Sequence, residues 1–143
     1  MNLDKFIFAF LLLFSFIIFF YDIKSKRMKN CISRNDNIKT NILVLLFLHQ
    51  LLQVFGNFSW LFYNKIILKF YVITIISYVF FMYINKNRCF LTQVINKICN
   101  WEDSTHFNDI FQILGFKKYD SWNNFYHYIY LIITIFIAIY KIM

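Results

Sequence analysis

The feature that most constrains this chain is a set of four long apolar runs, at about residues 5–23, 41–62, 66–85 and 124–141. A helix needs about 20 mostly apolar residues to cross a bilayer, and each run is close to that length. Hydrophobic residues make up 60% of the 143 residues, which is more apolar surface than a soluble domain of this size can bury. The sequence therefore predicts an all-α integral membrane protein, a single membrane domain with four transmembrane helices.

The first run has a competing interpretation as a secretory signal peptide. Such a peptide begins with a positively charged segment and ends at a cleavage site with small residues. The segment MNLDK before this run is barely positive, and bulky residues follow at 19–21, where small ones are needed. We therefore expect a first helix that is retained.

Lysine and arginine are concentrated in two of the polar intervals. The interval 24–40 holds six of them: Lys24, Lys26, Arg27, Lys29, Arg34 and Lys39. The interval 86–123 holds five: Lys86, Arg88, Lys97, Lys117 and Lys118. The opposite side of the predicted membrane domain holds four: Lys5, Lys65, Lys69 and Lys141.

This asymmetry predicts the orientation of the chain. The positive-inside rule places loops 24–40 and 86–123 in the cytoplasm, or in the matrix of a mitochondrion, with both termini on the opposite side. All three cysteines lie in these loops, so they would face a reducing compartment. We therefore expect no structural disulfide.

The formal net charge of +8 raises the question of nucleic-acid binding. The basic residues flank apolar spans, however, and they do not form one face with interleaved aromatic residues. Cations beside a membrane span are typical topology signals and contacts for anionic lipid headgroups. The expected partner is the lipid bilayer, and no nucleic acid is expected.

The second run carries a stripe of polar residues. His49, Gln53 and Asn57 recur at i, i+4 and i+8, so they share one face of a helix, with Gln50 beside them. Polar groups in hydrocarbon are costly unless paired, so this face should point into a helix bundle or a wet cavity. Two roles remain open, helix association and transfer of a proton or solute. No intramembrane carboxylate is evident, which favours association.

Two further faces suggest how the helices pack. The third run has milder polar residues on one side, expected to pair with the second helix: Tyr71, Thr74, Ser77 and Tyr78. The fourth run has a stripe stepping by four, whose last two members permit close helix approach: Tyr126, Tyr130, Thr134 and Ala138. Residues 64–65 form the predicted tip of a tight hairpin between the second and third runs.

The long interval 86–123 is predicted to hold an amphipathic helix that lies in the membrane interface. Its expected apolar face is Phe90, Leu91, Val94, Ile95 and Ile98. Its expected polar face is Thr92, Gln93, Asn96, Lys97 and Asn100. A second short helix should begin after Asp103 and Ser104, which suit the N-cap position, and end near Gly115.

Cysteine and histidine are the residues of this chain most suited to carry chemistry. No C-x-x-C motif occurs, and the spacing of Cys89 and Cys99 does not match a zinc site. His49 and His127 would lie at different depths, which disfavours a haem held by both. Thiol catalysis at Cys89 with His106 as base, and S-palmitoylation of Cys89, stay open, although an unmodified cysteine is favoured. No catalytic residue, cofactor or metal is predicted.

The run Cys89-Phe90-Leu91-Thr92, followed by Asn96, resembles a C-x-L-T-x3-N pattern found in small multi-pass membrane proteins of unknown function in large DNA viruses and some bacteria. In those proteins a histidine-bearing helix precedes the loop, as His49 does here. The resemblance implies a cytoplasmic docking turn at Cys89, Leu91, Thr92 and Asn96. The abundance of Phe, Ile, Asn, Lys and Tyr is also typical of an AT-rich genome, viral or organellar.

Three functions follow from these features. The favoured one is a non-enzymatic membrane protein whose loop 86–123 contacts lipid headgroups or a protein partner. The second is a small subunit of a larger membrane complex, in which the polar stripe packs against other subunits. The third is a membrane enzyme or channel that uses His49 and Gln53, or Cys89.

Overall fold

The computed structural model describes residues 3–34, 36–85, 89–102 and 122–143, and every regular element in these ranges is helical, which confirms the predicted all-α fold. The longer helices are α1 (Leu3–Lys24), α3 (Lys39–Phe58), α4 (Lys65–Ile84) and α7 (Trp122–Ile142). The shorter ones are α2 (Lys26–Arg34) and α5 (Phe90–Ile98), with single 3₁₀ turns at η1 (Asp36–Ile38) and η2 (Ser59–Leu61).

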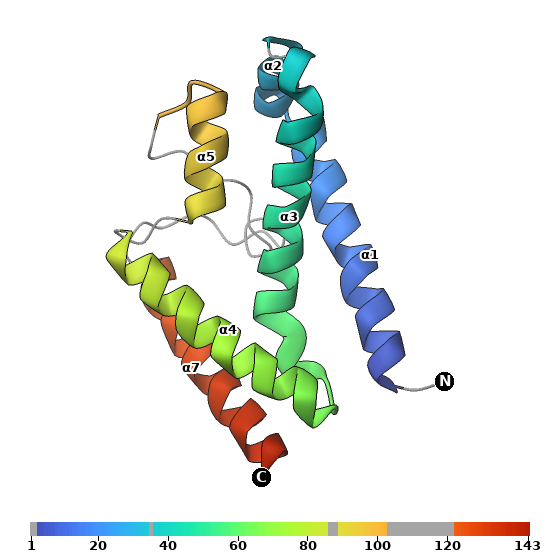
Figure 1. Cartoon of the computed structure of the whole chain (residues 1–143), viewed down its shortest axis with the longest axis vertical. Coiled ribbons are helices and arrows are strands. Elements are labelled where there is room, and N and C mark those ends of the chain that lie inside the picture. The colour runs from blue at the N-terminus through green and yellow to red at the C-terminus, as the bar shows by residue number, and fades with distance from the viewer. Residues whose placement is uncertain (1–2, 35, 86–88, 103–121) are drawn as a thin grey trace.

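The long helices form two antiparallel pairs (Figure 1). Helix α1 packs on α3, and α4 packs on α7. The two pairs are joined at one end, where α3 passes through η2 into α4, and the N- and C-termini lie at that same end. Helix α2 caps the opposite end of the α1–α3 pair, and α5 lies beside the neighbouring half of α3.

The α1–α3 pair is held by two matching stripes of buried residues. On α1 these are Leu11, Ser15, Ile18 and Asp22. On α3 they are Ile42, Leu46, Gln50 and Val54. Residues spaced three or four apart share one helix face, so each stripe buries one face against the other. Phenylalanine rings fill the rest of the seam, and the ring centroids of Phe16 and Phe47 lie 4.8 Å apart.

Helix α4 pairs with α7 and not, as expected, with α3. The Tyr71 hydroxyl donates a hydrogen bond to Thr134 Oγ1 at 2.8 Å, and Thr134 and Ala138 are buried. Their small side chains allow α7 to approach α4 closely. The predicted pairing of the polar face of α4 with the second helix was therefore wrong, and Thr74 and Ser77 are exposed.

The turn predicted at residues 64–65 is present, but α3 and α4 pack little on each other and do not form the tight hairpin that was expected. Asn64 caps α4, because its Oδ1 accepts hydrogen bonds from the backbone N–H groups of Ile66 and Ile67. The Asp4 carboxylate accepts a hydrogen bond from the Tyr63 backbone N–H at 2.8 Å. The start of α1 is thereby tied to the turn between α3 and α4.

The basic segment 24–40 contains a helix, where the sequence suggested only a solvated loop. Ser25 Oγ accepts a hydrogen bond from the Met28 backbone N–H at 3.2 Å, as an N-cap residue does. Met28 and Cys31 lie three residues apart on the buried face of α2. Burial of this short apolar face, with the cations outside, explains why the segment becomes helical.

A disulfide joins Cys31 of α2 to Cys99 at the end of α5, which contradicts the expectation of no structural disulfide. The expectation failed because it rested on compartment alone, whereas the fold brings the two Cα atoms to 5.2 Å. The Arg27 guanidinium also lies 4.4 Å from the centroid of the Trp101 ring, a cation–π contact. Two contacts therefore hold α2 to the chain at the end of α5.

The buried face of α5 differs from the predicted one. Thr92, Ile95 and Asn96 are buried where α5 packs on α3, whereas Phe90 is 69% exposed. The amphipathic pattern predicted the helix correctly but not its orientation. The disulfide at Cys99 lies on the same side as Ile95 and so turns that face inward.

Three helical segments are long and apolar enough to cross a membrane: Leu3–Lys24, Lys39–Leu61 and Lys65–Ile84. A shorter apolar helix, His127–Ile142, lies within α7. Large apolar side chains on these helices point outward, as in Phe70 and Phe136, which are 67% and 68% exposed. Outward apolar surface of this extent is typical of helices solvated by lipid. The second helix predicted after residue 103 and the side chain at position 126 lie outside the described residues.

Candidate functional site

The polar residues of α3 divide between two sides of the helix. Gln50 faces α1, where its Nε2 donates a hydrogen bond to Asp22 Oδ2. Both side chains are buried, with exposures of 0% for Gln50 and 3% for Asp22. His49, Gln53 and Asn57 form the adjoining stripe that the sequence predicted.

Asp22 is the residue that the sequence interpretation missed. It lies at the polar end of the first apolar run, and the sequence interpretation expected no carboxylate inside the bundle. The helix α1 in fact continues through Lys24. The signal was present in the spacing of Leu11, Ser15 and Ile18, because the next position on that face is residue 22. A buried carboxylate needs a donor, and the amide of Gln50 supplies one.

His49 lies beside Cys89, and the two residues are 40 positions apart in the sequence. The distance between Cys89 Sγ and His49 Nδ1 is 3.6 Å, which suits a hydrogen bond involving sulfur. This contact arises because α5 packs along α3, and Cys89 immediately precedes α5. The Tyr78 hydroxyl of α4 also interacts electrostatically with the Cys89 thiol and with Tyr128 of α7. Side chains from α3 and α4 therefore lie near this thiol.

The thiol–imidazole contact has a defined chemical capacity. A neighbouring base can accept the thiol proton and so generate the thiolate, which is the nucleophilic form of cysteine. The sequence had suggested His106 as that base, and this residue lies outside the described ranges. The described chain instead provides His49, a residue first noted for its place on the polar stripe.

The lower end of α3 contacts α7 through the backbone at Asn57. Asn57 Nδ2 donates a hydrogen bond to the Gln53 carbonyl oxygen at 2.8 Å. The Asn57 carbonyl oxygen accepts hydrogen bonds from Trp60 Nε1 at 3.0 Å and from the Tyr130 hydroxyl at 2.5 Å. The bond to α7 is therefore made by the backbone of α3, whereas the Asn57 side chain bonds within its own helix, and the role of the stripe in helix association stays a prediction.

Some acceptor atoms of the stripe remain available. Among the described residues, no donor pairs with Gln50 Oε1, Gln53 Oε1 or Asn57 Oδ1, and all three atoms are buried. A buried acceptor without a donor costs free energy. Donors from water or from another helix would relieve that cost.

The four residues of the C-x-L-T-x3-N pattern lie along α5 and its start, not at one point. Cys89 reaches His49, and Leu91 is half-buried. Thr92 and Asn96 are buried, and Asn96 Nδ2 donates a hydrogen bond to the Glu102 carbonyl oxygen at 3.2 Å. The polar members of the pattern therefore make their contacts inside the molecule.

The described residues contain no group of three or more His, Cys, Asp or Glu that could hold a metal ion. A scan against protein-family models and searches of curated proteins and of solved structures found no match. The chemistry of the site therefore follows from its own geometry, which is a polar stripe along α3 with a thiol–imidazole pair at its upper end.

Proposed function

We propose that the chain is a four-span membrane protein with a structural or interaction role, and that α7 is its fourth span. Helix α7 has 21 residues, which is about 31 Å of helix at 1.5 Å per residue and matches the hydrocarbon thickness. The Cys31–Cys99 disulfide supports this threading, because it needs both loops on one side and therefore an even number of spans between them. Helices α3 and α4 supply two.

The proposed orientation has loops 24–40 and 86–123 in the cytoplasm, or in the matrix of a mitochondrion. The bias of Lys and Arg toward these loops supports it. The disulfide argues the other way, because such bonds persist in oxidising compartments.

Thiol labelling tests both threading and orientation. Cys89 is the free cysteine of the described chain, and it would be labelled by a membrane-impermeant maleimide in a Cys31→Ser/Cys99→Ser background. We expect labelling only after the membrane is permeabilised. Labelling of Cys89 in intact cells would reverse the proposed orientation. A matched variant that retains Cys31 as its only cysteine tests the threading. If Cys31 and Cys89 are labelled from opposite sides of the membrane, the four-span threading is overturned.

The interaction role rests on the position of α5. Its inner face is buried on α3, and its Cys99 end is bonded to α2, so its outer face is presented in a fixed orientation. Phe90 on that face is 69% exposed, which suits an apolar anchor for a partner helix or for another subunit of a membrane complex. The resemblance of the C-x-L-T-x3-N pattern to small multi-pass membrane proteins implies a docking turn at the start of α5, which agrees with this proposal.

Site-specific photocrosslinking tests the interaction. A photoreactive residue at position 90 should give one discrete crosslinked protein in the native membrane. The same residue at position 83, which is 80% exposed on α4, serves as the control for random collisions in the bilayer. Equal products from both positions, or none from position 90, would contradict a partner at α5.

A second candidate function, a thiol-dependent membrane enzyme, is favoured by the contact between Cys89 and His49. In a Cys31→Ser/Cys99→Ser background, alkylation of Cys89 by iodoacetamide at pH 7 should slow by about tenfold when His49 is replaced by Gln, because the base is lost. Gln53→Leu, four residues along the same stripe, is the matched control. An unchanged rate in His49→Gln, with insertion preserved, would exclude base assistance.

A further inference from the structure

The basic end of the molecule contains an open groove between three helices. It lies where α1 ends, α2 crosses and α3 begins, and its volume is about 390 Å³. Two cations, one hydroxyl and three aliphatic side chains line it: Lys29, Lys39, Ser33, Ile23, Ile32 and Leu43. The groove therefore combines a positive part with an apolar part.

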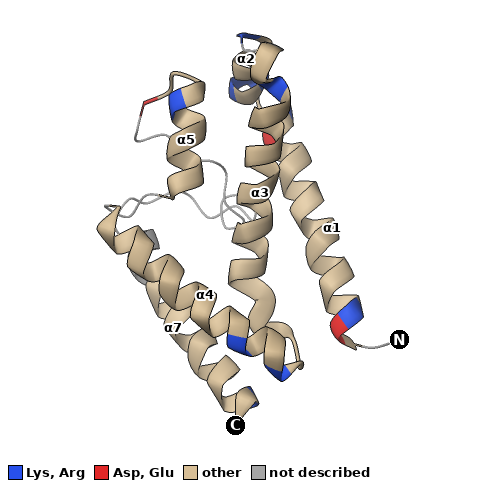
Figure 2. Ribbon diagram, viewed as in Figure 1, with Lys and Arg blue, Asp and Glu red and all other residues tan. Residues whose placement is uncertain are grey.

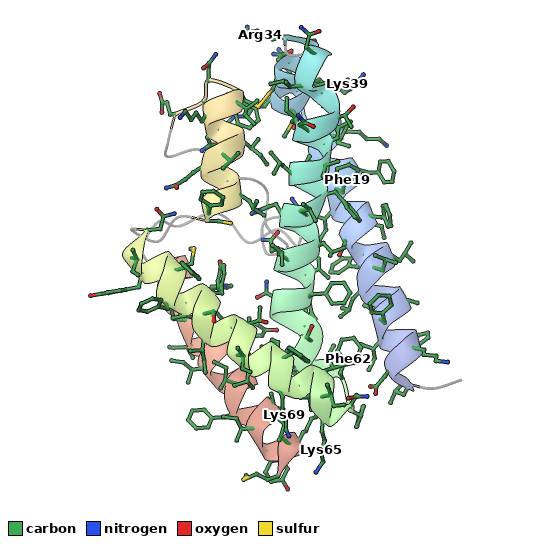
Figure 3. All side chains as sticks on the ribbon, viewed as in Figure 1. Phe19, Arg34, Lys39, Phe62, Lys65 and Lys69 are labelled. Atoms are coloured by element: carbon green, nitrogen blue, oxygen red, sulfur yellow. A yellow bond between two sulfur atoms is a disulfide. The ribbon has the colours of Figure 1, made fainter. Side chains whose placement is uncertain are left out.

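The positive part lies in the most cationic region of the described chain. Figure 2 shows Lys and Arg gathered over α2 and the start of α3, and Figure 3 places Arg34 and Lys39 together at this end. Lys29 and Lys39 are both exposed, so their ammonium groups remain hydrated and can reach a ligand. An anion at the groove would therefore meet two cations from different helices.

The apolar part continues toward the middle of the α1–α3 pair. Ile23 and Leu43 line the groove, and residues one turn deeper, Phe19 and Phe47, have ring centroids 5.4 Å apart. In Figure 3, Phe19 lies below Lys39 along the same helix pair. Phe16, another turn deeper, stays 39% exposed. An apolar path thus leads from the cations along the outside of the seam.

We propose that this groove binds an anionic phospholipid. The phosphate lies between the Lys29 and Lys39 ammonium groups, and one acyl chain follows the seam past Phe19 and Phe47. Free phosphate would satisfy the cations but leave the aliphatic walls uncovered, whereas a phospholipid matches both parts. This inference rests on the proposed membrane threading, since it requires the ends of α1 and α3 to lie at headgroup depth.

Native mass spectrometry of the full chain in a neutral detergent tests the proposal, with phosphatidylglycerol and phosphatidylcholine as probes. Phosphatidylglycerol should bind more tightly than phosphatidylcholine. Lys29→Gln/Lys39→Gln should weaken phosphatidylglycerol binding about 30-fold, because each cation near the headgroups contributes roughly a fivefold factor. Phosphatidylcholine binding should not change.

Lys24→Gln/Lys26→Gln is the matched control, because it removes two exposed cations from the same end but outside the groove. It should keep phosphatidylglycerol affinity within about threefold of the wild type. An equal loss in this control would overturn the groove in favour of diffuse charge. Displacement of the lipid by millimolar glycerol phosphate would overturn the lipid in favour of a phosphate site.

One further readout separates this inference from the function on which it rests. The wild-type chain should stay in liposomes through alkaline extraction. If it is extracted, the membrane threading fails. If it stays but shows no preference for phosphatidylglycerol, the threading survives and the lipid site alone is refuted.

Discussion

At the scale of single residues, the hydrogen bond between Asp22 and Gln50 is the contact whose loss should cost most. Both side chains lie in the buried seam of α1 and α3, and their hydrogen bond bridges the two helices. Burial makes each group dependent on the other, because neither can turn to water. The pair also sets the register of the two helices, since any slip would separate them.

Replacing Asp22 by Ala should therefore destabilise the fold by about 1–3 kcal/mol, the usual cost of an orphaned buried polar group. Asp22→Asn should cost less, because its amide oxygen can still accept the hydrogen bond from Gln50. The free energy of unfolding can be measured by titration with a denaturing detergent. The double variant Asp22→Leu/Gln50→Leu removes both polar groups, so it should recover most of the stability lost in the single variant. If the destabilisation of the double variant equals the sum of the two single variants, the pairing is contradicted.

At the scale of helices, the interface of α4 with α7 depends on small residues. Ala138 is fully buried and lies one turn beyond Thr134, whose hydroxyl accepts the hydrogen bond from Tyr71. One turn further along α7, Lys141 Nζ donates a hydrogen bond to the Trp60 carbonyl oxygen at 3.0 Å. The close approach near Ala138 and this end contact together hold the second helix pair to the end of α3.

Ala138→Phe should separate α4 from α7 and destabilise the fold by about 1–3 kcal/mol, because the interface has no room for the ring. Ile139→Phe introduces the same ring at the next position, which is 39% exposed, and should be nearly neutral. The same unfolding titration compares the two variants. Similar losses at both positions would show that α7 does not pack on α4 through this face.

At the scale of the whole molecule, the disulfide joins Cys31 and Cys99, which are 68 positions apart in the sequence. The disulfide lies at the basic end of the molecule. There it links α2, which packs against the α1–α3 pair, to the end of α5, which follows α4 in the chain. The end of the α1–α3 pair is thereby bonded covalently to the segment between α4 and α7. A covalent link of this kind restricts the unfolded chain more than any single contact in the molecule.

Cys31→Ser/Cys99→Ser should lower stability by about 2–4 kcal/mol, because a bridge over a long loop removes much of the entropy of the unfolded chain. It should also abolish the difference in gel mobility between reduced and non-reduced protein. Cys89→Ser is the control and should keep that difference. A wild-type chain with the same mobility in both conditions would mean that the bridge does not form.

The sequence by itself determined where the long helices are and which residues of α3 are polar on one face. These properties follow from local hydrophobic periodicity, which is a property of the sequence alone. The Thr134 and Ala138 face of α7 was predictable on the same basis, and the polar pair at residues 64–65 marked the turn before α4. Local pattern was insufficient for α5, because its apolar and polar faces are both partly buried.

Only the tertiary structure decided which residues meet. Asp22 and Gln50 are 28 residues apart, His49 and Cys89 are 40 apart, and Cys31 and Cys99 are 68 apart. Periodicity describes the face of one helix but carries no information about the partner of that face. For α4 and α7 the partner is selected by the fit of small side chains in α7. For His49 and Cys89 it is selected by the packing of α5 on α3. For Gln50 it is selected by the last turns of α1, which place the Asp22 carboxylate against the buried amide.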